Sequence, residues 1–301
     1  YMNAYLAELT GKDSALKCAN SLWIDSRLDV KTSFLQKNAD FYSAQAYKAD
    51  FTRKNTVNEI NSWVNKNTNG MIKKLVDEFD PLTVMVLMNA LCLEAEWDDP
   101  YTDNCVREGT FKNAKGNLVK AEYMYSQETE YIETENATGF VKYYKGGKFA
   151  FVALLPNEGT SIDSYIASLT GKGFLSALNS RKNTQVNTQM PKFKCEYSNS
   201  LVDTLKKMGM STAFDGDRAN FSSMATIKNE NIYISDVIHK TFIEVAEKGT
   251  RAGAATAVIV GESAAMPVEQ PKEVRLTRPF VYAIIDTRTN LPLFIGVQTD
   301  I

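Results

Sequence analysis

Cysteine and histidine are the side chains best suited to hold a transition metal, and this sequence has few of them. Cys18, Cys92, Cys105 and Cys195 lie far apart, and none belongs to a C-x-x-C pair. His239 is the only histidine in the chain. A zinc site needs three or four such ligands at suitable spacings. We therefore expect no metal site, and no motif in the sequence implies another cofactor.

A serine near residue 263 is the best candidate for nucleophilic catalysis. The motif Gly261-Glu262-Ser263-Ala264-Ala265 follows a β-branched run, as the nucleophile of many esterases does. Those enzymes end the motif with glycine, where this chain has Ala265, and they place a histidine after the serine. No histidine follows Ser263. Because a base that could activate the serine is missing, the sequence argues against a hydrolase.

The single histidine falls on a segment of alternating character. Across residues 231–247, every second side chain from Val237 to Val245 is apolar or β-branched except His239, which predicts a strand with the imidazole on its apolar face. A lone histidine there is more often a hydrogen-bonded core residue than a catalyst. Asn89 is the expected partner, since it is the only polar residue in the apolar run 84–93 and an unpaired buried amide costs about 1–3 kcal/mol.

Composition and charge exclude several classes of protein. The 301 residues are 44% hydrophobic and 23% charged, which is enough to bury a large core. The 34 lysines and arginines against 36 aspartates and glutamates give a net charge of -2, and no basic stretch is interleaved with aromatic residues. No apolar run is long enough to span a membrane, and residues 1–6 show no signal peptide. We expect neither nucleic acid nor a membrane as a partner.

The elements that must position these residues alternate irregularly, which favours an α+β fold over a doubly wound sheet. Two hairpins are expected, one joining residues 140–144 to 149–155 through two adjacent glycines and the other joining 280–285 to 293–297. Three helices are expected to begin at serine or threonine caps and to end at glycines: from Thr56 to Asn69-Gly70, from Ser161 to near Gly171, and from Ser198 to near Gly209.

Residues 247–267 differ from an ordinary loop. No strong turn signal lies between Gly249 and Gly261, and loops of this length are usually functional. Read at period two, the side that begins with Thr250 is uncharged, whereas Arg251 falls on the opposite side. A strand with this pattern could enter a sheet without burying a charge. A plain linker or an alanine-rich helix also fits the composition.

The residues Glu247-Lys248-Gly249-Thr250, followed by small side chains, resemble the hinge of the reactive-centre loop of the serpins, the serine protease inhibitor family. An ordered series of motifs across nearly the whole chain resembles further signatures of this family. They are Asn58-Glu59-Ile60-Asn61-Ser62-Trp63-Val64, Thr68-Asn69-Gly70, Val86-Leu87-Met88-Asn89-Ala90, Glu96-Trp97, Leu154-Leu155-Pro156-Asn157-Glu158-Gly159, Met190-Pro191-Lys192-Phe193, Leu205-Lys206-Lys207-Met208-Gly209-Met210, Ile238-His239-Lys240, Arg278-Pro279-Phe280 and Leu293-Phe294-Ile295-Gly296.

This resemblance implies a single α+β domain over residues 1–301 with the serpin fold: a large central, mainly antiparallel sheet, two further sheets and several surrounding helices. Family members begin with three helices that precede anything matching residues 1–13, so we expect this sequence to lack them. The reactive-centre loop is expected at residues 249–271. The family's spacing from Gly249 implies a scissile bond between Ser263 and Ala264, within a window that also includes Glu262, Ala265 and Met266.

The same resemblance implies roles in loop insertion for further residues. Asn89 and His239 match the shutter, where the central sheet parts, and Trp97 matches the breach, at the end of the sheet where insertion starts. The hinge residues that lead the loop into the sheet are Glu247, Gly249, Thr250, Ala252, Ala254, Ala255 and Thr256.

The resemblance implies an inhibitor with no catalytic residues of its own. The target serine protease cuts the loop, forms an acyl bond to it and is trapped when the loop inserts into the sheet. At about 3.3 Å per residue, the roughly fifteen residues from Gly249 to Ser263 would carry the protease on the order of 50 Å. Small uncharged side chains at residues 263–266 suit elastase-like or subtilisin-like proteases.

The alternative is a non-inhibitory serpin that acts as a carrier, chaperone or structural protein. Proline or an inward-facing charge between Thr250 and Val258 would favour it, and neither occurs. We therefore expect an inhibitor whose partner is a serine protease held in a covalent complex. We also expect a monomer, and an extracellular location because proteases of these classes mostly act outside cells.

Overall fold

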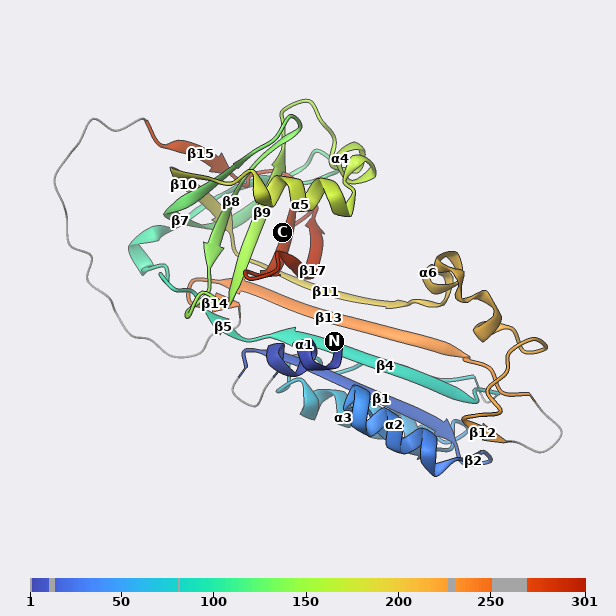
Figure 1. Cartoon of the computed structure of the whole chain (residues 1–301). Coiled ribbons are helices and arrows are strands. Elements are labelled where there is room, and N and C mark those ends of the chain that lie inside the picture. Colours follow the sequence, from blue (N-terminus) through green and yellow to red (C-terminus); the bar gives the residue numbers. More distant parts are fainter. Residues whose placement is uncertain (1, 11–13, 81, 227–230, 251–269) are drawn as a thin grey trace. The chain divides into compact units, whose positions relative to one another are not determined.

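The computed structural model describes residues 2–10, 14–80, 82–226, 231–250 and 270–301. This part of the chain divides into two compact units. Unit 1 comprises Tyr1–Leu93 and Glu196–Ile243, and unit 2 comprises Glu94–Cys195 and Glu244–Ile301. Figure 1 shows the elements of both, coloured along the sequence. The single domain expected from the sequence stays a prediction.

The helices of the described residues are mostly short. None of them is both long and apolar enough to cross a membrane. Unit 1 contains α1 (Met2–Leu9), α2 (Thr32–Tyr42), α3 (Lys54–Asn67), α6 (Val202–Leu205) and two short helical turns, η2 (Lys206–Met210) and η3 (Ser211–Phe214). Unit 2 contains η1 (Asp103–Cys105), α4 (Ile162–Ser168) and α5 (Gly171–Asn179).

A mixed sheet forms the framework of unit 1. Its strands run in the order β3 (Gln45–Ala49), β1 (Leu16–Asp25), β4 (Met85–Leu93) and β13 (Asp236–Ala246), and β11 (Phe193–Ser200) also pairs with β13. β1 pairs antiparallel with β4, whereas β1 with β3 and β4 with β13 are parallel pairs. A two-stranded sheet joins β2 (Asp29–Val30) to β12 (Ala225–Thr226).

An eight-stranded sheet dominates unit 2. Its path is β15 (Lys272–Arg275), β10 (Lys182–Pro191), β7 (Leu118–Glu133), β8 (Ala137–Tyr143), β9 (Phe149–Pro156), β16 (Phe280–Asp286) and β17 (Leu291–Gln298), with β6 (Val106–Lys112) beside β7. In the same unit, the last residues of β13 pair with β14 (Gly249–Thr250), which pairs in turn with β5 (Ala95–Glu96). These sheets and helices confirm the expected α+β fold.

Helix α3 packs on one face of the unit 1 sheet, as its resemblance to the helix lying across the main sheet implied. Ile60 and Val64 are fully buried and share a cluster with Val86 and Met88 of β4. The predicted cap at Thr56 is wrong, because the helix begins at Lys54. The Thr56 hydroxyl lies inside the first turn, where it donates to the Asp50 carbonyl at 2.6 Å.

The other two predicted helix starts have different outcomes. Ser161 caps α4 as expected, and its hydroxyl accepts from the Ser164 amide at 3.1 Å. This helix ends at Ser168, before the expected glycine, because Thr170 caps a second helix there. The cap predicted at Ser198 is wrong: this residue belongs to β11, and α6 begins only at Val202.

Both predicted hairpins are confirmed. Gly146 and Gly147, with φ angles of 81° and 65°, form the turn between β8 and β9. Asn290, with a φ of 57°, lies in the turn between β16 and β17. Every residue of β9 is buried, so this strand lies at the centre of the unit 2 core.

Candidate functional site

A series of hydrogen-bonded polar side chains crosses three strands of unit 1. The Nδ1 of His239 donates to the Asn89 Oδ1 at 2.9 Å, which confirms the predicted pairing. The Asn89 amide nitrogen donates in turn to the Asn20 Oδ1 at 2.8 Å and lies 3.6 Å from the Cys18 sulfur. Strand register explains the arrangement, since Asn89 lies directly opposite Asn20 on β1 and His239 on β13. We call these three residues and Cys18 the shutter cluster.

Burial sets the protonation states in the shutter cluster. It lowers the pKa of the His239 imidazole below 6.5, which favours the neutral ring. It also raises the pKa of the Cys18 thiol, against a smaller opposing effect of hydrogen bonds from Asn89 and Asn20. The cluster is therefore uncharged at neutral pH. Its hydrogen bonds join side chains of β1, β4 and β13.

The predicted hinge begins inside a sheet. Thr250 lies opposite Val245 of β13 on one side and opposite Ala95 of β5 on the other, and both pairings are antiparallel. Of the predicted hinge residues, Glu247, Gly249 and Thr250 belong to the described part of the chain. The predicted hinge residues Ala252, Ala254, Ala255 and Thr256, the predicted scissile bond between Ser263 and Ala264, and its window Glu262, Ala265 and Met266 lie outside the described residues.

Only glycine fits at residue 249. Its φ is 147°, in the region that other residues rarely adopt, and a Cβ built on it would lie 2.0 Å from the Ala95 carbonyl oxygen. Backbone approach this close requires the absence of a side chain. Gly249 therefore allows β14 to enter between β13 and β5.

The hinge threonine is hydrogen bonded and buried. Thr250 is 1% exposed, and its Oγ1 lies 2.5 Å from the Tyr144 hydroxyl oxygen. Burial raises the pKa of Tyr144, so its phenol stays protonated. The Tyr144 ring stacks on Trp97 with the centroids 4.4 Å apart and the planes 14° from parallel. Trp97 also binds the hinge, because its Nε1 donates to the Ala246 carbonyl at 2.9 Å.

A cation holds the carboxylate of the hinge. Lys192 contacts Glu247, and its Nζ lies 3.3 Å from the Glu122 Oε2. Burial alone would raise the pKa of Glu247, but the hydrogen bond and charge of Lys192 outweigh it and hold this pKa below its usual range. The turn between β13 and β14 is thus held by an ion pair as well as by main-chain hydrogen bonds.

Sequence reasoning did not identify four of these residues as parts of the site: Asn20, Cys18, Tyr144 and Lys192. Asn20 had a weaker signal than Asn89, because its strand also contains Lys17, Ser21 and Asp25. Lys192 stands within a motif that carries the family resemblance. Tyr144 is the last residue of a predicted strand, but its contact with Thr250 joins residues 106 positions apart, which local patterns do not reveal.

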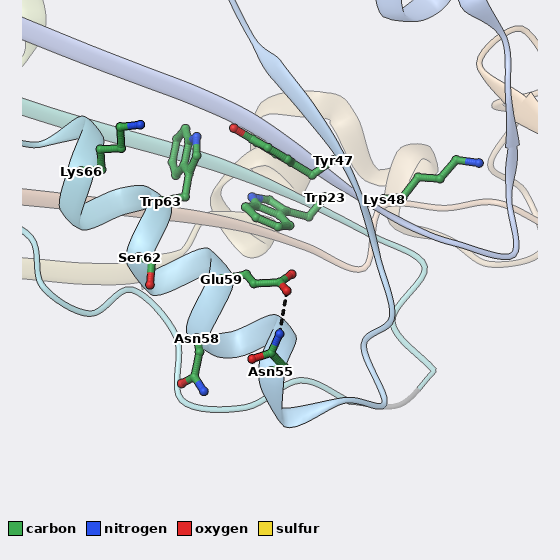
Figure 2. A pocket seen from close by; sticks show the side chains of 9 residues that line it. All are labelled: Trp23, Tyr47, Lys48, Asn55, Asn58, Glu59, Ser62, Trp63 and Lys66. Carbon is green, nitrogen blue, oxygen red and sulfur yellow. Dashed lines mark hydrogen bonds between the residues drawn. The ribbon is translucent and has the colours of Figure 1, made fainter.

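Two of the hollows among the described residues lie in unit 1, and neither of these two is lined by the shutter cluster. Figure 2 shows the larger, of about 480 Å³, with Trp63 of α3 on one side and Trp23 and Tyr47 on the other. Trp23 and Tyr47 stack with centroids 4.4 Å apart, and Lys48 and Lys66 stand at its rim. The second, of about 320 Å³, is lined by Glu78, Phe79, Asp80, Leu82, Thr83, Val86, Tyr233, Ser235 and Asp236.

Comparison with known proteins identifies the family. A model described as "Serpin (serine protease inhibitor)" matches residues 1–301. An uncharacterized serpin-like protein of Thermococcus kodakarensis is 32% identical over 298 residues, which are 98% of this chain and 69% of that protein. The crystal structure of the thermophilic serpin tengpin in its native state matches with a TM-score of 0.93 and 43% identity, over 100% of this chain and 78% of tengpin.

The latent state of tengpin matches less well, with a TM-score of 0.83 and 39% identity over 100% of this chain and 80% of that one. The described structure is thus more similar to the native form of tengpin than to the latent form. A family model that spans the whole chain, together with these relatives, shows that this chain belongs to the serpin family.

Proposed function

We propose that this protein inhibits serine proteases as a suicide substrate. The protease's serine Oγ attacks the carbonyl carbon of Ser263, and an ester forms while the peptide bond between Ser263 and Ala264 breaks. The departing amine of Ala264 takes up a proton from the protease's histidine. The cut strand then inserts between β4 and β13 before water can release the ester.

The single observation that carries the proposal is the register on the two sides of β14. Thr250 has Val245 and Ala95 as neighbours, and the shutter pairs His239 with Asn89. Val245 stands 150 positions after Ala95, and His239 stands the same 150 positions after Asn89. A strand that continued from Thr250 would therefore meet both neighbours in matching register, without a bulge or a slip.

This register predicts where each residue of the cut loop pairs. Counting along both neighbours puts Thr256 between Asn89 and His239, with its side chain on their face of the sheet. Its hydroxyl would take over hydrogen bonds that these two side chains now share. The ladder would end near residues 259–260, because β13 begins at Asp236 and β4 at Met85.

Strand direction supplies a driving force for insertion. β4 and β13 run parallel, and a strand continuing from β14 would be antiparallel to both. One parallel pairing, which is slightly less stable per residue, would be replaced by two antiparallel pairings. The intact protein is then held by a kinetic barrier. Because deacylation needs an ordered oxyanion hole, pulling on the acyl bond would stop hydrolysis.

The target class follows from residues 262–266, which lack a basic side chain. We propose elastase-like or subtilisin-like proteases, which accept small or unbranched uncharged side chains in their first pocket. We also propose that the inhibitor acts as a monomer, and outside the cell, where such proteases are mostly met.

The direct test is incubation with an elastase-like and a subtilisin-like protease. We expect a covalent complex that survives denaturant on a gel, and a released C-terminal peptide that begins at Ala264. A trypsin-like protease is the matched control and should form no complex. If the protease cuts the loop and leaves fully active, the inhibitory proposal is wrong, although the fold assignment stands.

Substitution of the hinge tests insertion separately. Thr250→Arg introduces a charge at a position that is 1% exposed, and it should convert the inhibitor into a substrate. Thr250→Ser keeps the hydroxyl that faces Tyr144 and is the control. Unchanged inhibition by the arginine variant would count against insertion of the strand.

A further inference from the structure

A lysine is buried in unit 2 close to the hinge. Lys142 of β8 is 2% exposed, and its Nζ donates to the Glu128 Oε1 of β7 at 2.8 Å. Glu128 itself is 13% exposed at its side chain. Burying an ion pair is costly, and an apolar pair of similar volume often serves a core as well or better. General stability therefore does not explain why the chain has a lysine here.

The lysine ammonium faces two aromatic rings. It lies 4.5 Å from the ring centroid of Tyr101 and 5.7 Å from that of Trp97, both within the range of a cation–π interaction. The carboxylate that fixes it is fixed in turn, because the Ser126 hydroxyl donates to the Glu128 Oε1 at 2.6 Å. In a desolvated place such contacts are stronger than at a surface. Lys142 thus holds two rings at once.

The same two residues hold the end of β13 through their main chains. The Trp97 amide donates to the Lys248 carbonyl and the Tyr101 amide to the Glu247 carbonyl, each at 2.9 Å. The Trp97 indole nitrogen donates to the Ala246 carbonyl, also at 2.9 Å. We call residues 246–248 the hinge anchor, because β14 starts directly after them.

We propose that Lys142 is a positioning residue for loop insertion: its cation holds Trp97 and Tyr101 against the hinge anchor, so that the cut loop turns into the sheet about a fixed point. The effect on inhibition rests on the function proposed above, whereas the effect on the hinge anchor does not. Lys142 does not contact the protease, and it acts through the two rings.

Hydrogen exchange tests the hinge anchor without any protease. In Lys142→Met, which keeps the length of the side chain and removes its charge, the Trp97 and Tyr101 amides should exchange about fivefold faster. Lys142→Arg is the matched control because it keeps a cation beside the rings and leaves the Glu128 carboxylate in place, and exchange at these two amides should change far less. Lys182→Met removes an exposed ion pair with Glu133 and should leave both rates unchanged.

Inhibition gives the second readout. In Lys142→Met, the fraction of inhibitor molecules that are cleaved without trapping the protease should rise about fivefold, while Lys142→Arg stays near the wild type. A general loss of stability would instead move both variants together and would overturn the proposal. If the methionine variant does not fold, the double change Lys142→Leu with Glu128→Leu removes both charges and should reproduce the faster exchange.

The two proposals fail in different ways. If the wild-type protein traps no protease, the proposed inhibition is wrong, and the exchange rates still decide the role of Lys142. If the wild type traps protease and Lys142→Met leaves the Trp97 and Tyr101 exchange rates unchanged, Lys142 does not hold the hinge anchor, and this inference is wrong.

Discussion

At the scale of the residue, His239 is unusual in being the only histidine in the chain. A change in stability through the range where imidazole titrates, if it disappears when His239 is replaced, can therefore be assigned to this one side chain. Burial lowers its pKa below 6.5, so the folded state binds its proton less readily than the unfolded state does. The stability that this difference contributes is present above 6.5 and is lost as the pH falls through the folded pKa.

We predict that the free energy of unfolding falls between about pH 7.5 and about pH 5.5 in the wild type and stays nearly level in His239→Gln. Urea unfolding at each pH measures it, and the single imidazole resonance in a proton spectrum gives the folded pKa. The prediction is contradicted if the unfolding free energy depends on pH equally in the wild type and in His239→Gln, or if the folded pKa of His239 lies above 6.5.

The hydrogen bond between Tyr144 and Thr250 gives a second prediction at this scale. Both residues are 1% exposed, so a hydroxyl that lost its partner would remain out of water. Thr250→Val and Tyr144→Phe should each lower the free energy of unfolding by about 1–3 kcal/mol, and the double variant should cost less than their sum. If the losses of unfolding free energy in the two single variants simply add in the double variant, the two hydroxyls do not interact.

The sequence predicted the pair Asn89 and His239 for a physical reason. Asn89 is the only polar residue of an apolar run and His239 lies on the apolar face of its strand, and such groups need partners. The contacts of Lys142 were not predictable in this way. A lysine within a hairpin strand gives no sign of burial, and its partners Tyr101 and Glu128 come from separate stretches of the chain.

At the scale of the element, α3 is tied to the segment that leads to β4. The Asn61 Oδ1 accepts from the Leu75 and Val76 amides at 2.7 and 3.1 Å, and its Nδ2 donates to the Val76 carbonyl at 2.9 Å. One side chain thus satisfies three main-chain groups of a segment that has no strand or helix of its own.

We predict that Asn61→Ala lowers the free energy of unfolding by about 1–3 kcal/mol and speeds hydrogen exchange at residues 75 and 76. Asn58→Ala, which changes an exposed residue on the same helix, should do neither. Protection at residues 75 and 76 that did not depend on Asn61 would show that other contacts hold this segment.

Element boundaries were predicted less well than element types. Thr56 and Ser198 were expected as caps because threonine and serine often occupy that position. Thr56 lies within the first turn of α3, and Ser198 belongs to β11, where tertiary contacts outweigh the local preference. The two hairpins were predictable because adjacent glycines or a short polar turn specify them locally.

At the scale of the whole molecule, the proposed insertion predicts a large gain in stability after cleavage. A strand of about ten residues would add hydrogen bonds on both sides, worth several kcal/mol, and the melting temperature should rise by roughly 10 °C or more. Calorimetry before and after limited proteolysis measures this change. Cleaved Thr250→Arg is the control, and it should show no comparable rise. A cleaved wild type that melts where the intact protein does would exclude insertion.

The two strands beside β14 have equal residue spacings, and this equality restricts which insertions and deletions the protein can tolerate. Six positions separate Asn89 from Ala95, and the same number separates His239 from Val245. Losing or gaining one codon within either stretch would shift one neighbour against the other and turn alternate side chains to the wrong face. Natural variants of this protein should therefore differ by substitutions in these two stretches, and length changes should be confined to segments outside them.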